Sequence, residues 1–166
     1  MERIWAPWRT VYVGGKQNEG CIFCEKIQSD HSHDEKNYLL LRSDQVFTLL
    51  NLYPYSNGHI MVAPVKHVGD IAGLTENEFL QIGKVTKYMA GLLKEVFKPD
   101  GFNIGANLGK VAGAGIPGHI HVHIVPRWNG DTNFMSVVGD VRVISEALDT
   151  TYKKLRAAME VIKFPG

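Results

Sequence analysis

Apolar residues form short runs or alternate with polar residues in several segments of this chain. The segments YLLLRS (38–43), QVFTLLNLY (45–53) and HIMVAP (59–64) have the composition of β-strands, and turn-forming residues separate them. FNIGANLG (102–109) and HIHVHIVP (119–126) have similar composition, and a glycine-rich loop lies between them. The pattern therefore predicts about five strands.

A spacing of three or four residues predicts two helices. Thr75 and Glu78 have the spacing of a capping box, and Pro99 follows the first stripe of apolar residues, so one long helix is expected from about residue 75 to Lys98. A second stripe predicts a closing helix over residues 143–162. Strands joined by tight turns around an inserted helix indicate an α+β fold with an antiparallel sheet of about five strands, one long inserted helix and a C-terminal helix. The stripes are Phe79, Ile82, Val85, Met89, Leu92 and Val96 in the first helix, and Ile144, Leu148, Leu155, Met159 and Ile162 in the second.

The length of 166 residues fits one domain with a core of its own. Within this single domain, residues 1–36 are expected to form an N-terminal arm anchored by Trp5 and Trp8. Residues 37–128 are expected to form the core, and 129–166 a tail and helix. The polar stretch QSDHSHDEKN, residues 28–37, is predicted to be a loop.

Charge and hydropathy exclude some partners. The formal net charge is +1 and no block of five or more like charges occurs, which argues against binding to a nucleic acid polymer. No apolar run approaches the ~18 to 20 residues that span a bilayer. The first ten residues contain charges and a proline where a secretory signal would be continuously apolar. We therefore expect a cytoplasmic protein with no membrane partner.

Three histidines alternate with aliphatic residues in HIHVHIV, residues 119–125. In a strand, His119, His121 and His123 would lie on one face at spacings of roughly 6.6 Å, and the aliphatic residues would lie on the other. Three buried imidazoles without polar partners would be costly, so their face should meet polar groups. Metal ligands must converge within about 2.1 Å of one point, which argues against a metal site built from this strand alone. The three rings are therefore expected to do different jobs.

This strand resembles the His-φ-His-φ-His-φ-φ signature, with φ apolar, of the histidine triad (HIT) superfamily of nucleotide hydrolases and transferases. The resemblance covers most of the chain. NLYPYSNGHIMVAP is similar to the family's nucleoside-binding hairpin, and GFNIGANLG is similar to its next strand. Together IWAPWR, NLYPY, GFNIGANLG and HIHVHIVPRWNGDTNF look closest to the bacterial branch of diadenosine tetraphosphate phosphorylases and hydrolases. The resemblance implies a small-molecule nucleotide as substrate and a homodimer.

The resemblance also implies roles for the histidines. His121 would be the nucleophile that forms a nucleotidyl-imidazole, and a neutral imidazole suits that role near neutral pH. The backbone carbonyl of His119 would fix the tautomer of His121. His123 would donate to phosphate oxygens, and His59 would join them at the phosphate.

Three further positions are nucleotide-binding candidates by resemblance. Asn51 stands where relatives bind the ribose, although it could equally be a strand-end residue that stabilises the turn. Asn107 stands where relatives place an amide on the α-phosphate. Gly115 belongs to the glycine-rich loop, which leaves backbone N–H groups accessible to an anion. Phosphorylases of the branch carry serine at the position of Gly115, so this departure favours water as an acceptor.

Cys21 and Cys24 have C-x-x-C spacing, and two thiolates make half of a tetrahedral zinc site. A redox pair is disfavoured because a βαβ context is lacking. His31 and His33 could complete the site locally. The resemblance implies instead that His67 and His119 complete it, with zinc in a structural role.

The leading hypothesis is an enzyme that cleaves a dinucleoside polyphosphate through a nucleotidyl-His121 intermediate. Arg127, Trp128 and the following tail could hold a second nucleoside. Phosphorolysis of the same substrate, hydrolysis of a nucleoside phosphoramidate, and nucleotide binding without turnover stay open as alternatives, as does a histidine-rich metal carrier.

Overall fold

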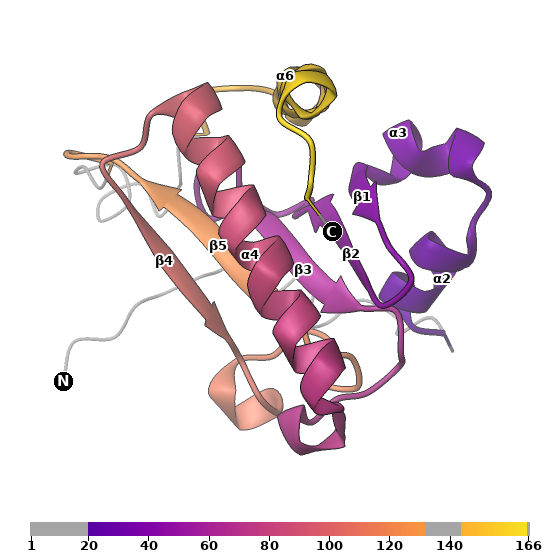
Figure 1. Ribbon diagram of the computed structural model, residues 1–166. Helices are drawn as coiled ribbons and strands as arrows, with labels where there is room; N and C mark the ends of the chain where they lie inside the picture. Colours follow the sequence, from indigo (N-terminus) through magenta and orange to yellow (C-terminus); the bar gives the residue numbers. More distant parts are fainter. Residues whose placement is uncertain (1–19, 132–143, 166) are drawn as a thin grey trace, which may run out of the picture.

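The computed structural model describes residues 20–131 and 144–165 of the chain (Figure 1). Its five strands form one sheet in the order β1-β2-β3-β5-β4, and every neighbouring pair is antiparallel. The predicted α+β class, with about five antiparallel strands, is confirmed. In chain order the elements are α2 (Ile22–Gln28), η1 (His31–His33), α3 (Asp34–Asn37), β1 (Leu39–Arg42), β2 (Val46–Leu50), β3 (Ile60–Pro64), η2 (Ile71–Gly73), α4 (Glu76–Phe97), β4 (Gly101–Ala106), η3 (Lys110–Ala112), β5 (Val122–Arg127) and α6 (Leu148–Val161).

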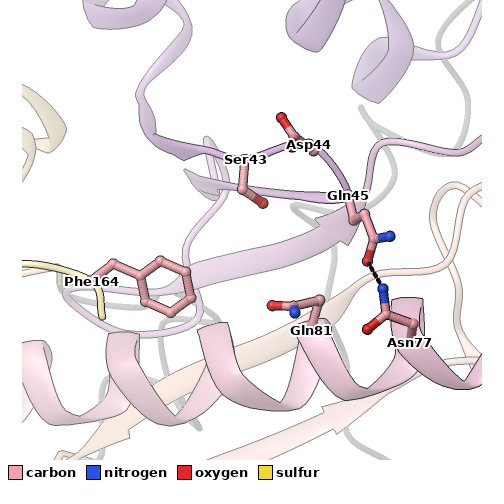
Figure 2. A pocket seen from close by; sticks show the side chains of 6 residues that line it. All are labelled: Ser43, Asp44, Gln45, Asn77, Gln81 and Phe164. Carbon is pink, nitrogen blue, oxygen red and sulfur yellow. Dashed lines mark hydrogen bonds between the residues drawn. The ribbon is translucent and has the colours of Figure 1, made fainter. Parts of the chain in front are cut away.

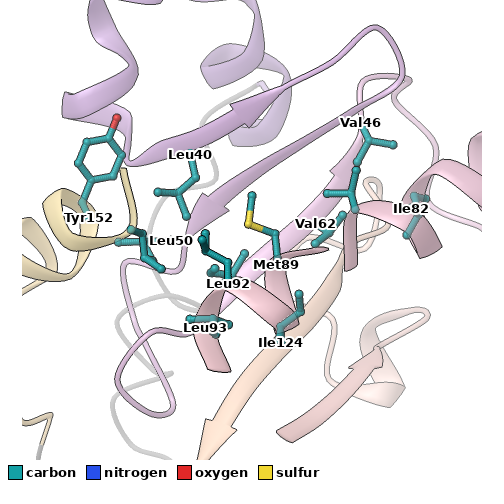
Figure 3. Close-up of a cluster of buried hydrophobic side chains, with 13 residues drawn as sticks. Leu40, Val46, Leu50, Val62, Ile82, Met89, Leu92, Leu93, Ile124 and Tyr152 are labelled. Carbon is teal, nitrogen blue, oxygen red and sulfur yellow. The ribbon is translucent and has the colours of Figure 1, made fainter. Parts of the chain in front are cut away.

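The long helix α4 lies across one face of the sheet, and α6 lies beside it next to β1 (Figure 1). Aliphatic side chains from the strands meet those of the helices there and form the main core (Figure 3). Burial of this apolar surface is the largest favourable contribution to folding. The core residues are Leu40, Val46, Leu50, Ile60, Val62, Ile82, Val85, Met89, Leu92, Leu93, Ile124, Tyr152 and Leu155.

The start of α4 follows the sequence prediction. Thr75 accepts a hydrogen bond from the Glu78 N–H, and the Glu78 side chain accepts one from the Thr75 N–H, so the expected capping box is present. Lys98 adopts a left-handed conformation at the C-cap. The prediction that Phe79 belongs to the buried stripe is wrong, since Phe79 is 56% exposed. The first turn of α4 lies beside the β1–β2 turn, where Asn77 donates to Gln45, and so it does not cover the sheet.

A second, smaller core occupies the opposite face. The ring of Phe23, from α2, is fully buried there against residues of β2 and β3. This face carries the histidines, because Met61 pairs with His123 across β3 and β5. The buried members of this core are Phe23, Leu39, Phe47, Leu49, Met61 and Ala63.

Three sequence predictions need correction. Residues 28–37 are not a loop, because α2 extends to Gln28 and the turns η1 and α3 follow, with Asp30 capping η1 through the Ser32 N–H. The C-terminal helix begins at Leu148 rather than at residue 143. The last strand begins at Val122, so His119 and His121 precede it. Trp5, Trp8 and residues 132–143 lie outside the described residues. None of the helices within residues 20–131 and 144–165 is long and apolar enough to cross a membrane.

Candidate active site

The ring of His121 is held in one tautomer. Its Nδ1 lies 2.8 Å from the backbone oxygen of His119, and a carbonyl only accepts, so Nδ1 carries the hydrogen. In the neutral ring, Nε2 then holds the lone pair. The expected contact between His119 and His121 is therefore present.

The surroundings of His121 favour its neutral form. The residue is 6% exposed, and its ring packs 4.8 Å from that of Phe23. Burial lowers the pKa of His121, while the hydrogen bond to the His119 carbonyl opposes this shift. The polar partners expected for the buried imidazoles of His119 and His121 are backbone carbonyl oxygens. Both rings pack against Phe23, and backbone carbonyls satisfy their N–H groups.

His59 and His123 form a hydrogen-bonded chain that starts at a backbone amide. The N–H of Tyr55 donates to Nδ1 of His59 over 3.1 Å, so in the neutral ring the hydrogen is on Nε2. That Nε2 lies 2.9 Å from Nδ1 of His123. When both rings are neutral, His59 donates to His123 and leaves a hydrogen on Nε2 of His123. The rings of His121 and His123 are 4.8 Å apart, so this donor belongs to the same site as the lone pair of His121.

The four residues expected to bind metal lie together. The ligand atoms of Cys21, Cys24, His67 and His119 are all within 4.8 Å of one another. Nε2 of His119 is 2.8 Å from the carbonyl oxygen of Pro64, so its Nδ1 presents a lone pair to the two sulfurs, at 3.4 and 3.6 Å. A metal-binding histidine typically donates its other N–H to a backbone carbonyl in this way. Two thiols and two imidazoles suit zinc.

The two alternative ligands are not part of this cluster. His31 and His33 lie in η1, where both are exposed on the surface. The structure thus gathers the completing pair that the resemblance implied, His67 and His119, around the cysteines. Burial lowers the pKa of His119, and the Pro64 hydrogen bond opposes this shift.

The three predicted nucleotide-binding residues have different local contacts. The side-chain oxygen of Asn51 accepts the Tyr53 N–H over 2.9 Å, which is the turn-stabilising contact considered for it. Asn107 follows Ala106, the partner of Val122, and its amide donates to the Gly113 carbonyl over 3.4 Å. Gly115 is exposed in the loop before His119.

Sequence reasoning missed Phe23 and the Tyr55 amide. Phe23 stands inside the C-x-x-C motif, and an aromatic residue between two metal ligands is a readable signal of packing next to the cluster. No signal in the sequence identifies a backbone amide as the anchor of a histidine pair.

Two hollows open on the surface of the described residues. One, of about 370 Å³, is lined by α2 and the segments around it, including Ile22, Lys26, Asn37 and Leu52. Its lining includes none of His59, His119, His121 and His123. The other, of about 300 Å³, lies at the opposite core beside α4 and has no histidine or cysteine in its lining (Figure 2).

Comparison with known proteins places this geometry in a family. A family model described as HIT domain matches residues 33–130. The AP-4-A phosphorylase of Mycobacterium tuberculosis is 35% identical over 164 residues, which cover 93% of this chain and 83% of that protein.

Two solved structures are similar over most of their length. One is a hypothetical histidine triad nucleotide-binding protein from Sulfolobus tokodaii, with a TM-score of 0.69 and 29% identity, covering 86% of this chain and 94% of that one. The other is a Zn-bound histidine triad family protein from Mycobacterium smegmatis, with a TM-score of 0.68 and 27% identity, covering the same shares.

Proposed function

This chain belongs to the HIT domain family, and we propose that it cleaves a dinucleoside polyphosphate, such as diadenosine tetraphosphate, through a nucleotidyl-His121 intermediate. The observation that carries the proposal is the tautomer of His121. Its Nδ1–H is engaged by the His119 carbonyl, which leaves the lone pair on Nε2 for a phosphorus atom. The similarity to an AP-4-A phosphorylase supports the class of substrate.

In the first step, Nε2 of His121 attacks the α-phosphorus. A P–N bond forms, and the bond from this phosphorus to its bridging oxygen breaks. The electron pair leaves with the polyphosphate, which departs as an anion. The ring keeps its Nδ1–H and becomes positively charged, and the His119 carbonyl stabilises that charge. The charge also makes the P–N bond easy to break in the second step.

His123 supports this step by hydrogen bonding. The chain from Tyr55 through His59 leaves a hydrogen on Nε2 of neutral His123, so His123 donates to a phosphoryl or bridging oxygen on which negative charge develops. Asn107 and the loop around Gly115 are proposed to contact the same phosphate, and Asn51 the ribose.

We propose water as the acceptor in the second step. Water attacks the phosphorus, the P–N bond breaks, and His121 recovers its lone pair while the proton of the water passes to solvent. Gly115 offers no side-chain group to hold inorganic phosphate, which favours this choice. Phosphorolysis is the second candidate, and the similarity to a phosphorylase favours it.

We propose zinc as a structural metal bound by Cys21, Cys24, His67 and His119. When bound, it would cross-link α2 to the segments that carry the two histidines and take no part in the reaction. The similarity to a Zn-bound family member supports this assignment. We expect His67→Ala to lose zinc and the double variant His31→Ala/His33→Ala to keep it, as measured by elemental analysis. The reverse result would reassign the ligands.

We propose a homodimer formed along β4. This strand is at the sheet edge, with β5 as its neighbour, and its last four residues are exposed, including Ile104 at 50%. An exposed edge strand pairs readily with another strand. Light scattering is expected to show a dimer for the parent protein and a monomer for Ile104→Lys. A monomeric parent would contradict the proposal.

Product analysis tests the reaction. Purified protein is incubated with diadenosine tetraphosphate, with and without inorganic phosphate, and the products are separated. AMP plus ATP formed without phosphate means hydrolysis, and ADP plus ATP formed only with phosphate means phosphorolysis. Intact-mass measurement after rapid quenching should show one added nucleotidyl group, absent in His121→Ala. Nucleotide binding without cleavage or added mass would make the protein a nucleotide-binding protein instead.

A further inference from the structure

The ring of Phe23 connects the metal cluster with the candidate nucleophile. Phe23 lies between Cys21 and Cys24 in sequence and is fully buried. Its ring centroid is 4.8 Å from that of His121 and 5.1 Å from that of His119. One side chain thus contacts a proposed metal ligand and the proposed nucleophile.

His119 connects the same two sites through its backbone. Its side chain faces the two sulfurs, and its carbonyl accepts the Nδ1–H of His121. A displacement of His119 would therefore disturb the hydrogen bond that sets the tautomer. Phe23 packs on the rings of both His119 and His121.

We propose that Phe23 is a positioning residue that holds the ring of His121 in its reactive orientation and transmits to it the packing imposed by the Cys21–Cys24–His67–His119 cluster. The inference rests on the proposed function for its effect on turnover, but its effect on the His121 ring is independent of turnover.

The physical reason is the packing of rings at contact distance. An imidazole held by one hydrogen bond can still rotate unless neighbouring atoms fill the space around it, and close-packed interiors leave little such space. Cys21 and Cys24 are both cluster members, so ligation would fix the turn that carries Phe23. Small losses of alignment at a reacting atom lower rates steeply.

The test compares two substitutions of the same type in the same core. Phe23→Ala would leave a large cavity, so Phe23→Leu is used, which keeps the site apolar and largely filled. The matched control is Phe47→Leu. Phe47 is also fully buried, and its ring centroid lies 6.2 Å from Phe23 and 6.2 Å from His119, with no ring contact to His121.

Two measurements are made on the zinc-loaded proteins at one pH. The first is the tautomer of His121 by ¹⁵N-histidine NMR, with its signal assigned by its loss in His121→Ala. The second is the separation of kcat from KM. We expect Phe23→Leu to reduce the Nδ1–H form of His121 and to lower kcat about tenfold, with KM changed less than about twofold. Phe47→Leu should leave both the tautomer and kcat as in the parent.

Removal of zinc with a chelator tests the transmission. In the parent and in Phe47→Leu, the His121 signal should move in the direction seen for Phe23→Leu. In Phe23→Leu, zinc removal should add little, because coupled positions are not additive. Equal NMR changes in the two leucine variants, or an equal response to zinc in the parent and Phe23→Leu, would overturn the proposal. If the parent has no turnover, the proposed function fails, and the NMR comparison still decides the role of Phe23.

Discussion

The two faces of the sheet bury different kinds of side chain. The face covered by α4 and α6 buries aliphatic residues of the strands, among them Val46, Val62 and Ile124. The face next to α2 buries the imidazoles of His119 and His121 beside Phe23. Aliphatic side chains in a core gain stability from area and packing alone. A core that contains imidazoles must also satisfy their N–H groups.

Because of this difference, the α4 face contributes mainly to stability, whereas the histidine face also fixes the tautomers of its imidazoles. On the histidine face, backbone oxygens of Pro64 and His119 accept the buried imidazole N–H groups. These bonds set which nitrogen of each ring keeps its lone pair. The described residues of the α4 core include no histidine, so no tautomer is set there. Substitutions on the two faces should therefore have separable effects.

The largest expected effect is on the histidine face. His121→Ala should lower turnover of diadenosine tetraphosphate by roughly 10⁴-fold or more, since it removes the proposed nucleophile. The free energy of unfolding should change far less, by no more than about 3 kcal/mol. Turnover is measured by nucleotide separation and stability by urea unfolding. His31→Ala, which changes an exposed histidine outside the site, is the control and should match the parent.

The next effect belongs to the α4 face. Leu93→Ala should lower the free energy of unfolding by about 2–5 kcal/mol, because Leu93 is fully buried and its truncation leaves a cavity. The turnover of the folded fraction should stay within about twofold of the parent. Leu80→Ala, on the exposed side of α4, should change stability by less than about 0.5 kcal/mol. A loss of turnover in folded Leu93→Ala would show that the two faces are coupled.

The smallest effect is a gain in stability. Thr48 is fully buried, and its hydroxyl has no hydrogen-bond partner among the described residues. It alternates with Val46 and Leu50 and so faces the α4 core. Thr48→Val keeps the shape and removes the unsatisfied hydroxyl, so thermal and urea unfolding should show about 1 kcal/mol more stability. A destabilised variant would mean that this hydroxyl is satisfied in solution.

The sequence predicted the α4 face well because local signals specify it. Spacing and the capping box place α4 from Glu76 to Phe97 without reference to the rest of the fold. Phe79 was misplaced because periodicity tells which side of a helix is apolar but not where the sheet beneath it ends. The stretch 28–37 was misread because its short helical turns depend on contacts such as the Asp30 cap rather than on apolar spacing.

The histidine face was predicted in its residues but not in its geometry. The alternating histidines suggested one strand, but β5 starts only at Val122. Pro64, at the end of β3, lacks an N–H, and its carbonyl is used by His119, while the Ile120 N–H donates to Val68. Residues 119–121, which precede β5, therefore lie outside the sheet, and the rings of His119 and His121 turn toward Phe23. Such contacts depend on segments far apart in sequence, and no local pattern reveals them.

The distance along the chain between cluster members has a consequence for synthesis. Cys21 and His119 are 98 residues apart, and Cys24 and His67 are 43 apart. A ribosome that adds about 5–20 residues per second takes roughly 5 to 20 s to pass from the cysteines to the last histidine. Throughout that interval the nascent chain carries two thiols whose final partner does not yet exist. The arrival of one short segment, from His119 to His123, then completes the proposed metal-binding cluster and the proposed catalytic histidines in the same event.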